Sequence, residues 1–238
     1  LVEEFDYPKL GAGMMYERMA EELHKHGVEF LMGTNVEKVN LNDHMHVQSV
    51  EIKESDQIRE IPVKTLFSSI PLTKLIQSIE PQVPDNIVPS SNNLFFRDHI
   101  TVDLIVDQDH LFKDQWIYVH SQDVKMARLA NYNNFSPYMS EKHKSAISVE
   151  YFAFIGDEIW NLSDEELIEL ASDELAYMNL ISRDSIEKGI VIREPDSYPT
   201  YFIGYEAYYK TVLEYLRKIE NLQCIGRGGM FKYNNMDH

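Results

Sequence analysis

The stretch that decides the fold is GRGGMFKYNNMDH, residues 226–238. It follows a short apolar run, residues 221–225, which is typical of a buried strand. A strand that breaks at Gly-Arg-Gly-Gly lets a ligand approach the backbone closely. Arg227 and Lys232 add positive charge, and the polar residues that follow add neutral hydrogen-bonding groups. The stretch therefore predicts contact with a phosphate-bearing ligand that also carries sugar hydroxyls.

This stretch resembles the C-terminal flavin motif of UDP-galactopyranose mutases and their relatives, in which Gly-Arg is followed by Tyr, Asn or Asp, Met and Asp. A second stretch, YPKLGAGM at residues 7–14, is similar to the Tyr-Pro-Lys-Gly-Gly-Met segment of a wider superfamily. That superfamily contains the FAD-dependent amine oxidases, protoporphyrinogen oxidases and phytoene desaturases. Because the two motifs bracket the chain, the resemblance covers essentially all of it.

The glycine-rich fingerprint of a dinucleotide-binding domain is missing from the sequence. No Gly-x-Gly-x-x-Gly follows an apolar strand near the first residues. Gly11 and Gly13 supply the first two glycines, but Tyr16 stands where the third belongs. We therefore interpret the chain as a portion of a longer flavoprotein, inactive by itself. We expect FAD to be its cofactor in the longer protein and to be absent or substoichiometric on this chain alone.

Composition excludes several classes of function. The net charge of −17 and the pI near 4.9 argue against binding nucleic acid or an anionic membrane through bulk charge. A single cysteine fits a reducing compartment. Neither a signal peptide nor an apolar run of about 20 residues is visible, so we expect a cytoplasmic protein without a membrane span. No spacing of His, Cys or carboxylates favours a metal site.

Hydrophobic periodicity predicts a mixed α+β fold with a largely antiparallel sheet and helices. Apolar residues recur at helical spacing over residues 12–27, and Ser163 with Glu166 forms a capping box that opens another helix. Further helices are expected after Pro71 and over 206–219, and a Pro-rich loop over 80–93. Strands are expected at 28–32, 35–39, 46–53, 58–69, 94–107, 115–120, 126–132, 146–154, 189–193 and 221–225.

The order of these elements predicts two domains. Residues 1–70 and 221–238 are expected to pack together, with Ile225 close to residues 28–31 and 66–69. Residues 71–220 are expected to form a separate body. In the resembling family the end pieces belong to the FAD domain and the insertion to the substrate domain. The resemblance thus implies an intact substrate-binding domain and an incomplete FAD-domain remnant built from both chain ends.

Site residues follow from the same resemblance. It implies that the cofactor is contacted by Lys9, Gly11, Gly13, Val36, Gly226, Arg227, Gly228 and Asp237. Substrate contacts are expected from exposed aromatic residues and from basic residues that face a diphosphate. The candidates are Arg97, Trp116, Tyr118, Tyr151 and Tyr233. Each aromatic residue on a predicted strand could instead belong to an ordinary sheet core.

Three functions stay open at this point. The first is a UDP-galactopyranose mutase-like isomerase that acts on a nucleotide sugar in the synthesis of cell-surface polysaccharide or lipopolysaccharide. In that family reduced FAD carries the chemistry, so no side chain is assigned a catalytic role. The second is an oxidase or desaturase of the amine oxidase superfamily. The third is a binding module without catalysis. The sequence does not predict the oligomeric state.

Overall fold

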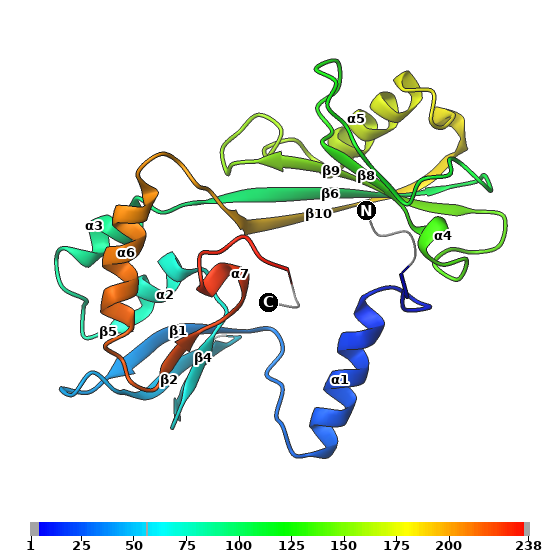
Figure 1. Cartoon of the computed structure of the whole chain (residues 1–238). Helices are drawn as coiled ribbons and strands as arrows, with labels where there is room; N and C mark the ends of the chain where they lie inside the picture. Colours follow the sequence, from blue (N-terminus) through cyan, green and yellow to red (C-terminus); the bar gives the residue numbers. More distant parts are fainter. Residues whose placement is uncertain (1–4, 56, 236–238) are drawn as a thin grey trace. The chain divides into compact units, whose positions relative to one another are not determined.

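The computed structural model describes residues 5–55 and 57–235, and these fold into two compact units (Figure 1). Unit 1 contains the residues up to Phe30 together with Asp98–Pro195. Unit 2 contains Leu31–Arg97 together with the residues from Asp196 onward. In the part of the chain that the structure describes, no helix combines the length and the apolar composition that crossing a membrane requires.

The bounds of these units differ from the two expected domains. Residues 5–30 group with 98–195, whereas 71–97 and 196–220 group with 31–55, 57–70 and 221–235. The reason is packing: Leu72 and Leu216, which lie in the expected insertion, share one buried cluster with Val39 and Val47. The structure therefore assigns these helices to the same core as the strands they were expected to leave.

Unit 1 is built on a five-stranded sheet with the order β10-β6-β9-β8-β7. Strands β6 and β9, β9 and β8, and β8 and β7 pair antiparallel, as the sequence predicted. Strands β6 and β10 each cross from the residue range of one unit into that of the other. The elements are α1 (Gly13–Lys25), β6 (Phe96–Val106), β7 (Trp116–Tyr118), β8 (Arg128–Asn131), α4 (Tyr132–Phe135), β9 (Ser145–Ala153), α5 (Asp164–Tyr177), η1 (Arg183–Ser185) and β10 (Ile186–Pro199).

The two faces of this sheet have opposite character because side chains alternate along each strand. On one face, Ile100, Val102 and Val149 are fully buried in a cluster that also contains Leu167 and Leu175 of α5. The other face carries polar residues at the intervening positions. They are His99, Asp103, Arg128, Ser148 and Glu150. We call this second surface the polar sheet face.

Helix α5 begins as the sequence predicted. The Ser163 hydroxyl accepts a hydrogen bond from the Glu166 N–H at 3.2 Å, and the Glu166 carboxylate accepts one from the Ser163 N–H at 2.7 Å. This reciprocal pair satisfies two backbone donors that would otherwise lack partners at the first turn. The capping box is therefore confirmed.

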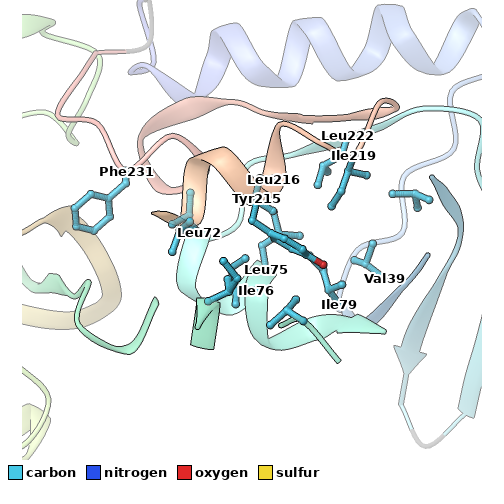
Figure 2. Packing of buried hydrophobic residues seen from close by; sticks show 14 of the residues in the cluster. Val39, Leu72, Leu75, Ile76, Ile79, Tyr215, Leu216, Ile219, Leu222 and Phe231 are labelled. Carbon is cyan, nitrogen blue, oxygen red and sulfur yellow. The ribbon is translucent and has the colours of Figure 1, made fainter. Parts of the chain in front are cut away.

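Unit 2 contains a four-stranded sheet with the order β3-β2-β1-β5 and a separate ladder of two parallel strands, β11 and β4. Buried residues from its helices and strands pack into one cluster (Figure 2). The pairing of β11 with β4 confirms that the 221–225 strand lies beside residues 66–69. The elements are β1 (Thr34–Leu41), β2 (Val47–Glu54), β3 (Gln57–Pro62), β4 (Leu66–Ser68), α2 (Leu72–Ser78), β5 (Ile79–Glu80), α3 (Ile87–Asn92), α6 (Tyr205–Leu216), β11 (Leu222–Cys224) and α7 (Gly226–Gly229).

Three sequence predictions of local structure are wrong. Residues 28–32 form no strand; they connect two glycines with positive φ, Gly27 and Gly33. The single strand expected over 58–69 is two strands in different sheets, since the chain leaves the β2 pairing at Pro62. The loop expected over 80–93 contains α3.

Helix α1 forms as predicted, but its apolar stripe is not covered. Met15, Met19 and Leu23 are all exposed, and no residue of the helix is buried within the described chain. Helical spacing correctly predicted which residues share a face. It did not predict that this face would lack a packing partner in the described residues.

Candidate functional site

The Gly-Arg-Gly-Gly stretch forms a tight turn directly after β11. Gly226 has a φ of +67°, a conformation that side chains with a Cβ rarely adopt, and it begins the short helix α7. A Cβ at Gly228 would lie 3.0 Å from the Ser69 carbonyl oxygen, and one at Gly229 would overlap the Ser68 carbonyl. The last two glycines therefore allow this turn to approach the end of β4, the protein's own backbone.

The contacts that the structure describes for Arg227 are all with uncharged groups. Its Nε and Nη2 donate to the Asn234 carbonyl at 3.2 and 2.9 Å. Its Cζ lies 4.4 Å from the ring centroid of Tyr198 and 5.2 Å from that of Tyr233. Among residues 5–55 and 57–235, no carboxylate pairs with this guanidinium, which is partly buried. The arrangement presents an oriented cation that an anion could bind.

Tyrosine residues of unit 2 fix the segment that follows Arg227. The Tyr201 hydroxyl accepts a hydrogen bond from the Tyr233 N–H at 2.7 Å, and the Tyr209 hydroxyl donates to the Met230 carbonyl at 3.0 Å. Tyr233 itself is 62% exposed and stacks on Tyr198 at 5.7 Å. The Tyr233 side chain is therefore oriented by its backbone and its ring, while much of its surface remains accessible.

The polar sheet face of unit 1 is organised around Glu150. Its Oε2 accepts hydrogen bonds from His99 Nε2 at 2.9 Å, from Arg128 Nε at 2.8 Å, and from Arg128 Nη2. The other ring nitrogen of His99 lies 3.6 Å from Glu194 Oε2. Burial alone would raise the pKa of Glu150, but the hydrogen bonds and charges of His99 and Arg128 lower this pKa below its usual value. Glu150 is thus held ionised.

A second polar group lies on the same face. Ser148 donates a hydrogen bond to Asp103, and its Oγ is 2.9 Å from the Tyr132 hydroxyl oxygen. Burial raises the pKa of Asp103 and that of Tyr132, because desolvation disfavours their charged forms. The polar sheet face therefore combines one carboxylate held ionised, Glu150, with one, Asp103, that takes up a proton more readily than usual.

Exposed aromatic rings border this face within unit 1. Trp116 is 49% exposed and stacks on Phe135 at 5.6 Å with an interplanar angle of 19°. Tyr118 is also exposed, and the Arg128 guanidinium lies 5.8 Å from its ring centroid. A planar ligand could stack on either accessible ring. Both residues are exposed, and their contact with substrate stays a prediction.

The YPKLGAGM motif lies in unit 1, against the residues around α4. The Lys9 backbone carbonyl accepts a hydrogen bond from the Ser136 hydroxyl at 2.7 Å. The Lys9 side-chain ammonium lies 3.9 Å from the Tyr138 ring centroid. Gly11 has a φ of +94°, and a Cβ there would lie 3.0 Å from the Met139 side chain. Gly13, in contrast, has open space where its Cβ would stand.

The remaining predicted site residues are dispersed. Tyr151 is fully buried and donates a hydrogen bond to Glu174 at 3.0 Å, because it points to the apolar face of the sheet. Its position is that of a core residue and not of a substrate contact. Val36 is an exposed residue of β1 and Arg97 an exposed residue of β6. Asp237 lies outside the described residues. Within the described ranges, His, Cys, Asp and Glu form no group suited to a metal ion.

Sequence reasoning missed several residues that organise the polar sheet face and the surroundings of Arg227. His99, Asp103, Ser148 and Glu150 lie in segments correctly predicted as strands, and their polar character at alternate positions was the available signal. The Arg227 guanidinium lies over the ring of Tyr198, which is 29 positions earlier in the chain. Local sequence patterns do not link residues that far apart.

Comparison with known proteins finds similarity in structure only. No protein-family model matches the sequence, and no curated protein matches it. The fold is similar to that of the reduced form of a UDP-galactopyranose mutase, with a TM-score of 0.79 and 17% identity over 94% of this chain and 46% of that one. It is also similar to a putative protoporphyrinogen oxidase from Exiguobacterium sp. 255-15, with a TM-score of 0.69 and 17% identity over 92% and 47% of the two chains.

A putrescine oxidase bound to putrescine matches with a TM-score of 0.60 and 15% identity, over 90% of this chain and 47% of that one. These structures belong to the superfamily of FAD-dependent amine oxidase-like proteins, so the resemblance expected from the two motifs is confirmed at the level of the fold. The chain spans about half the length of the structures that it matches.

Proposed function

We propose that this chain is the substrate-binding portion of a flavin-dependent enzyme that acts on a nucleotide sugar, in the manner of a UDP-galactopyranose mutase. The observation that carries the proposal is Arg227, a partly buried cation that lies beside the two stacked rings of Tyr198 and Tyr233 and has no acidic partner among the described residues. The net charge of −17 repels anionic ligands from the chain as a whole. A local cation such as Arg227 would attract an anionic ligand in spite of this repulsion.

The chemistry of the neighbouring groups supports a diphosphate as this ligand. A planar guanidinium can bind two phosphate oxygens at once, and the exposed Tyr233 hydroxyl can donate to a third. Tyr198 and Tyr201 orient these two residues through ring and backbone contacts. In this proposal the protein binds and orients the nucleotide diphosphate.

FAD fits this chain only in part. Gly13 and Gly226 leave space beside the backbone. The space beside Gly228 and Gly229 is already filled by the backbone of Ser68 and Ser69. The sequence also lacks the glycine-rich fingerprint that binds a pyrophosphate. We therefore propose that Gly226 and Arg227 of unit 2 border a flavin held mainly by residues outside this chain. The flavin would supply the redox or nucleophilic chemistry when bound.

A second candidate, oxidation of an amine, is favoured by the polar sheet face. Glu150 is held ionised there, and Asp103 and Glu194 add further carboxylates. A cationic amine would complement such a surface, and one structure with this fold contains putrescine. Arg128 and His99 already partner Glu150, however, so the acidic excess is small.

Calorimetric titration of the longer protein with UDP, FAD and putrescine separates these functions. Arg227→Ala should weaken UDP or FAD binding by about 2–5 kcal/mol if the guanidinium is desolvated against a phosphate. Tyr233→Phe should cost about 0.5–1.5 kcal/mol. The matched control is Arg59→Ala, which removes an exposed arginine of β3. Unchanged affinity for both nucleotides in Arg227→Ala would refute the phosphate contact, and binding of putrescine alone would favour the oxidase.

A further inference from the structure

Strand β11 and helix α6 of unit 2 border a cavity of about 340 Å³. Leu213 and Leu216 of the helix and Leu222 of the strand supply apolar lining. Leu216 and Leu222 also belong to the buried cluster of this unit, in which Figure 2 labels both. Small-molecule pockets in proteins have volumes of about 300–1,000 Å³ and mostly apolar walls. The cavity therefore has the size and the lining of a site for a small ligand with an apolar body.

Arg217 is the only charged side chain among the described residues that line this cavity. It is exposed, and within residues 5–55 and 57–235 no carboxylate pairs with it. Burial raises the pKa of Tyr209, another lining residue, and the positive charge of Arg217 opposes this rise, so the guanidinium acts on the space beside the Tyr209 hydroxyl. That hydroxyl already donates to the Met230 carbonyl at 3.0 Å. The guanidinium is therefore the group with which an acidic ligand would pair.

Strand β11 adds neutral hydrogen-bonding groups to the lining. The Gln223 side chain is exposed and has no hydrogen-bond partner in the part of the chain that the structure describes. The Ile225 N–H donates to the Ser68 carbonyl at 2.9 Å, and backbone groups of a parallel strand alternate in direction. The N–H of Cys224, one position earlier, therefore points away from β4. Both groups can donate to a ligand at the edge of β11 that β4 leaves open.

We propose that this cavity binds a small monocarboxylate with an apolar or aromatic body. The carboxylate pairs with Arg217 and accepts hydrogen bonds from Gln223 and the Cys224 N–H, while the apolar body contacts the leucines of the lining. A dianion such as phosphate is disfavoured, because a single cation would leave one of its charges unpaired beside apolar side chains. The nucleotide and the flavin of the proposed function are assigned to none of these side chains, so the site does not depend on that function.

Calorimetric titration of the longer protein with 4-phenylbutyrate tests the ion pair. We expect a Kd of about 1 mM or below, and about tenfold weaker binding of the neutral analogue 4-phenyl-1-butanol, which cannot pair with a cation. Arg217→Gln should weaken binding of the acid to the level of the alcohol. The matched control Lys218→Gln alters the exposed residue next to Arg217 and should bind the acid as wild type does. Absent binding at about 10 mM acid, equal affinities for acid and alcohol, or equal effects of the two substitutions would overturn the proposal.

Alkylation of Cys224 locates the ligand independently. Cys224 is the only cysteine of this chain and lines the cavity, and burial raises its pKa, so iodoacetamide should modify it slowly. At a concentration of about four times Kd, 4-phenylbutyrate should slow this modification about fivefold, as measured by mass spectrometry of the peptide that contains Cys224. The protection should disappear in Arg217→Gln and persist in Lys218→Gln. Calorimetric binding without protection of Cys224 would mean that the acid binds elsewhere, and the proposal would be wrong.

Discussion

The side-chain amide of Asn221 hydrogen-bonds both backbone groups of Val47, residues that lie 174 positions apart. Its Oδ1 accepts from the Val47 N–H at 2.8 Å, and its Nδ2 donates to the Val47 carbonyl at 2.9 Å. The same Nδ2 donates to the Lys64 carbonyl at 3.0 Å. One buried side chain therefore joins the start of β2, the residues before β4 and the start of β11.

Asn221→Ala should destabilise the protein by about 2–4 kcal/mol, because it removes three hydrogen bonds to backbone groups, two of them to the fully buried Val47. Urea unfolding followed by circular dichroism measures this loss. Asn92→Ala serves as control, since Asn92 is exposed at the end of α3 and should stay within about 0.5 kcal/mol of wild type. Equal effects of the two substitutions would show that the amide is dispensable.

Gly229→Ala should cost about 2–4 kcal/mol, because its Cβ would overlap the Ser68 carbonyl oxygen and separate α7 from β4. Gly13→Ala is the matched control: its Cβ meets open space, and alanine favours the first turn of α1. In thermal unfolding, the melting temperature of Gly229→Ala should fall, and that of Gly13→Ala should rise or stay unchanged. A neutral Gly229→Ala would contradict the packing described for this turn.

Tyr151→Phe should lower the free energy of unfolding by about 1.5–3 kcal/mol, since it removes a hydrogen bond to the buried Glu174 carboxylate. It should leave UDP binding unchanged, because Tyr151 lies in the core of unit 1. Denaturant titration and calorimetry check the two effects. The control Tyr177→Phe alters an exposed tyrosine of α5 and should change neither. A large loss of ligand affinity in Tyr151→Phe would restore its predicted contact with substrate.

Glu150 predicts an acid-dependent stability. Its pKa in the folded protein is below the ordinary value of about 4.3, so its contribution is present above that value and is lost as pH falls through the folded pKa. Glu150→Gln should destabilise by about 3 kcal/mol at pH 7, where Arg128 and His99 lose their shared carboxylate. The difference from wild type should shrink toward pH 3. A penalty that stays constant with pH would contradict this assignment.

Asp103 should affect the pH dependence of stability in the opposite direction to Glu150, so Asp103→Asn is the matched variant. Burial raises its pKa, so its folded state is favoured by protonation, and this contribution is lost as pH rises above the unfolded value of about 3.9. Asp103→Asn should therefore be neutral or stabilising at pH 7. Urea unfolding at pH 4 and pH 7 compares it with Glu150→Gln. If both variants were equally destabilised at pH 7, the two carboxylates would not differ in environment.

Local sequence patterns predicted much of the secondary structure. The capping box at Ser163 correctly placed the start of α5, and helical spacing predicted α1 and α6. The apolar and β-branched run over 94–107 correctly predicted β6. These features succeed because their causes, capping and side-chain periodicity, act over a few residues.

Long-range features could not be predicted in the same way. The role of Asn221 depends on Val47, and nothing in either sequence neighbourhood indicates the other. Arg227 was singled out from its motif, but its ring partner Tyr198 was not. The expected domain bounds differ from the compact units because α2 and α6 return to the cluster around Val39. Each of these outcomes is decided by tertiary packing.

The division of the chain into units has a consequence for its synthesis on the ribosome. Unit 2 is completed only when the residues from Asp196 onward join Leu31–Arg97, and the whole of Asp98–Pro195 is translated in between. At about 5–20 residues per second, the first part of unit 2 waits roughly 5–20 s for its second part. During that interval Leu72 and Leu75 lack α6, so the nascent chain exposes an unfinished core to which chaperones could bind.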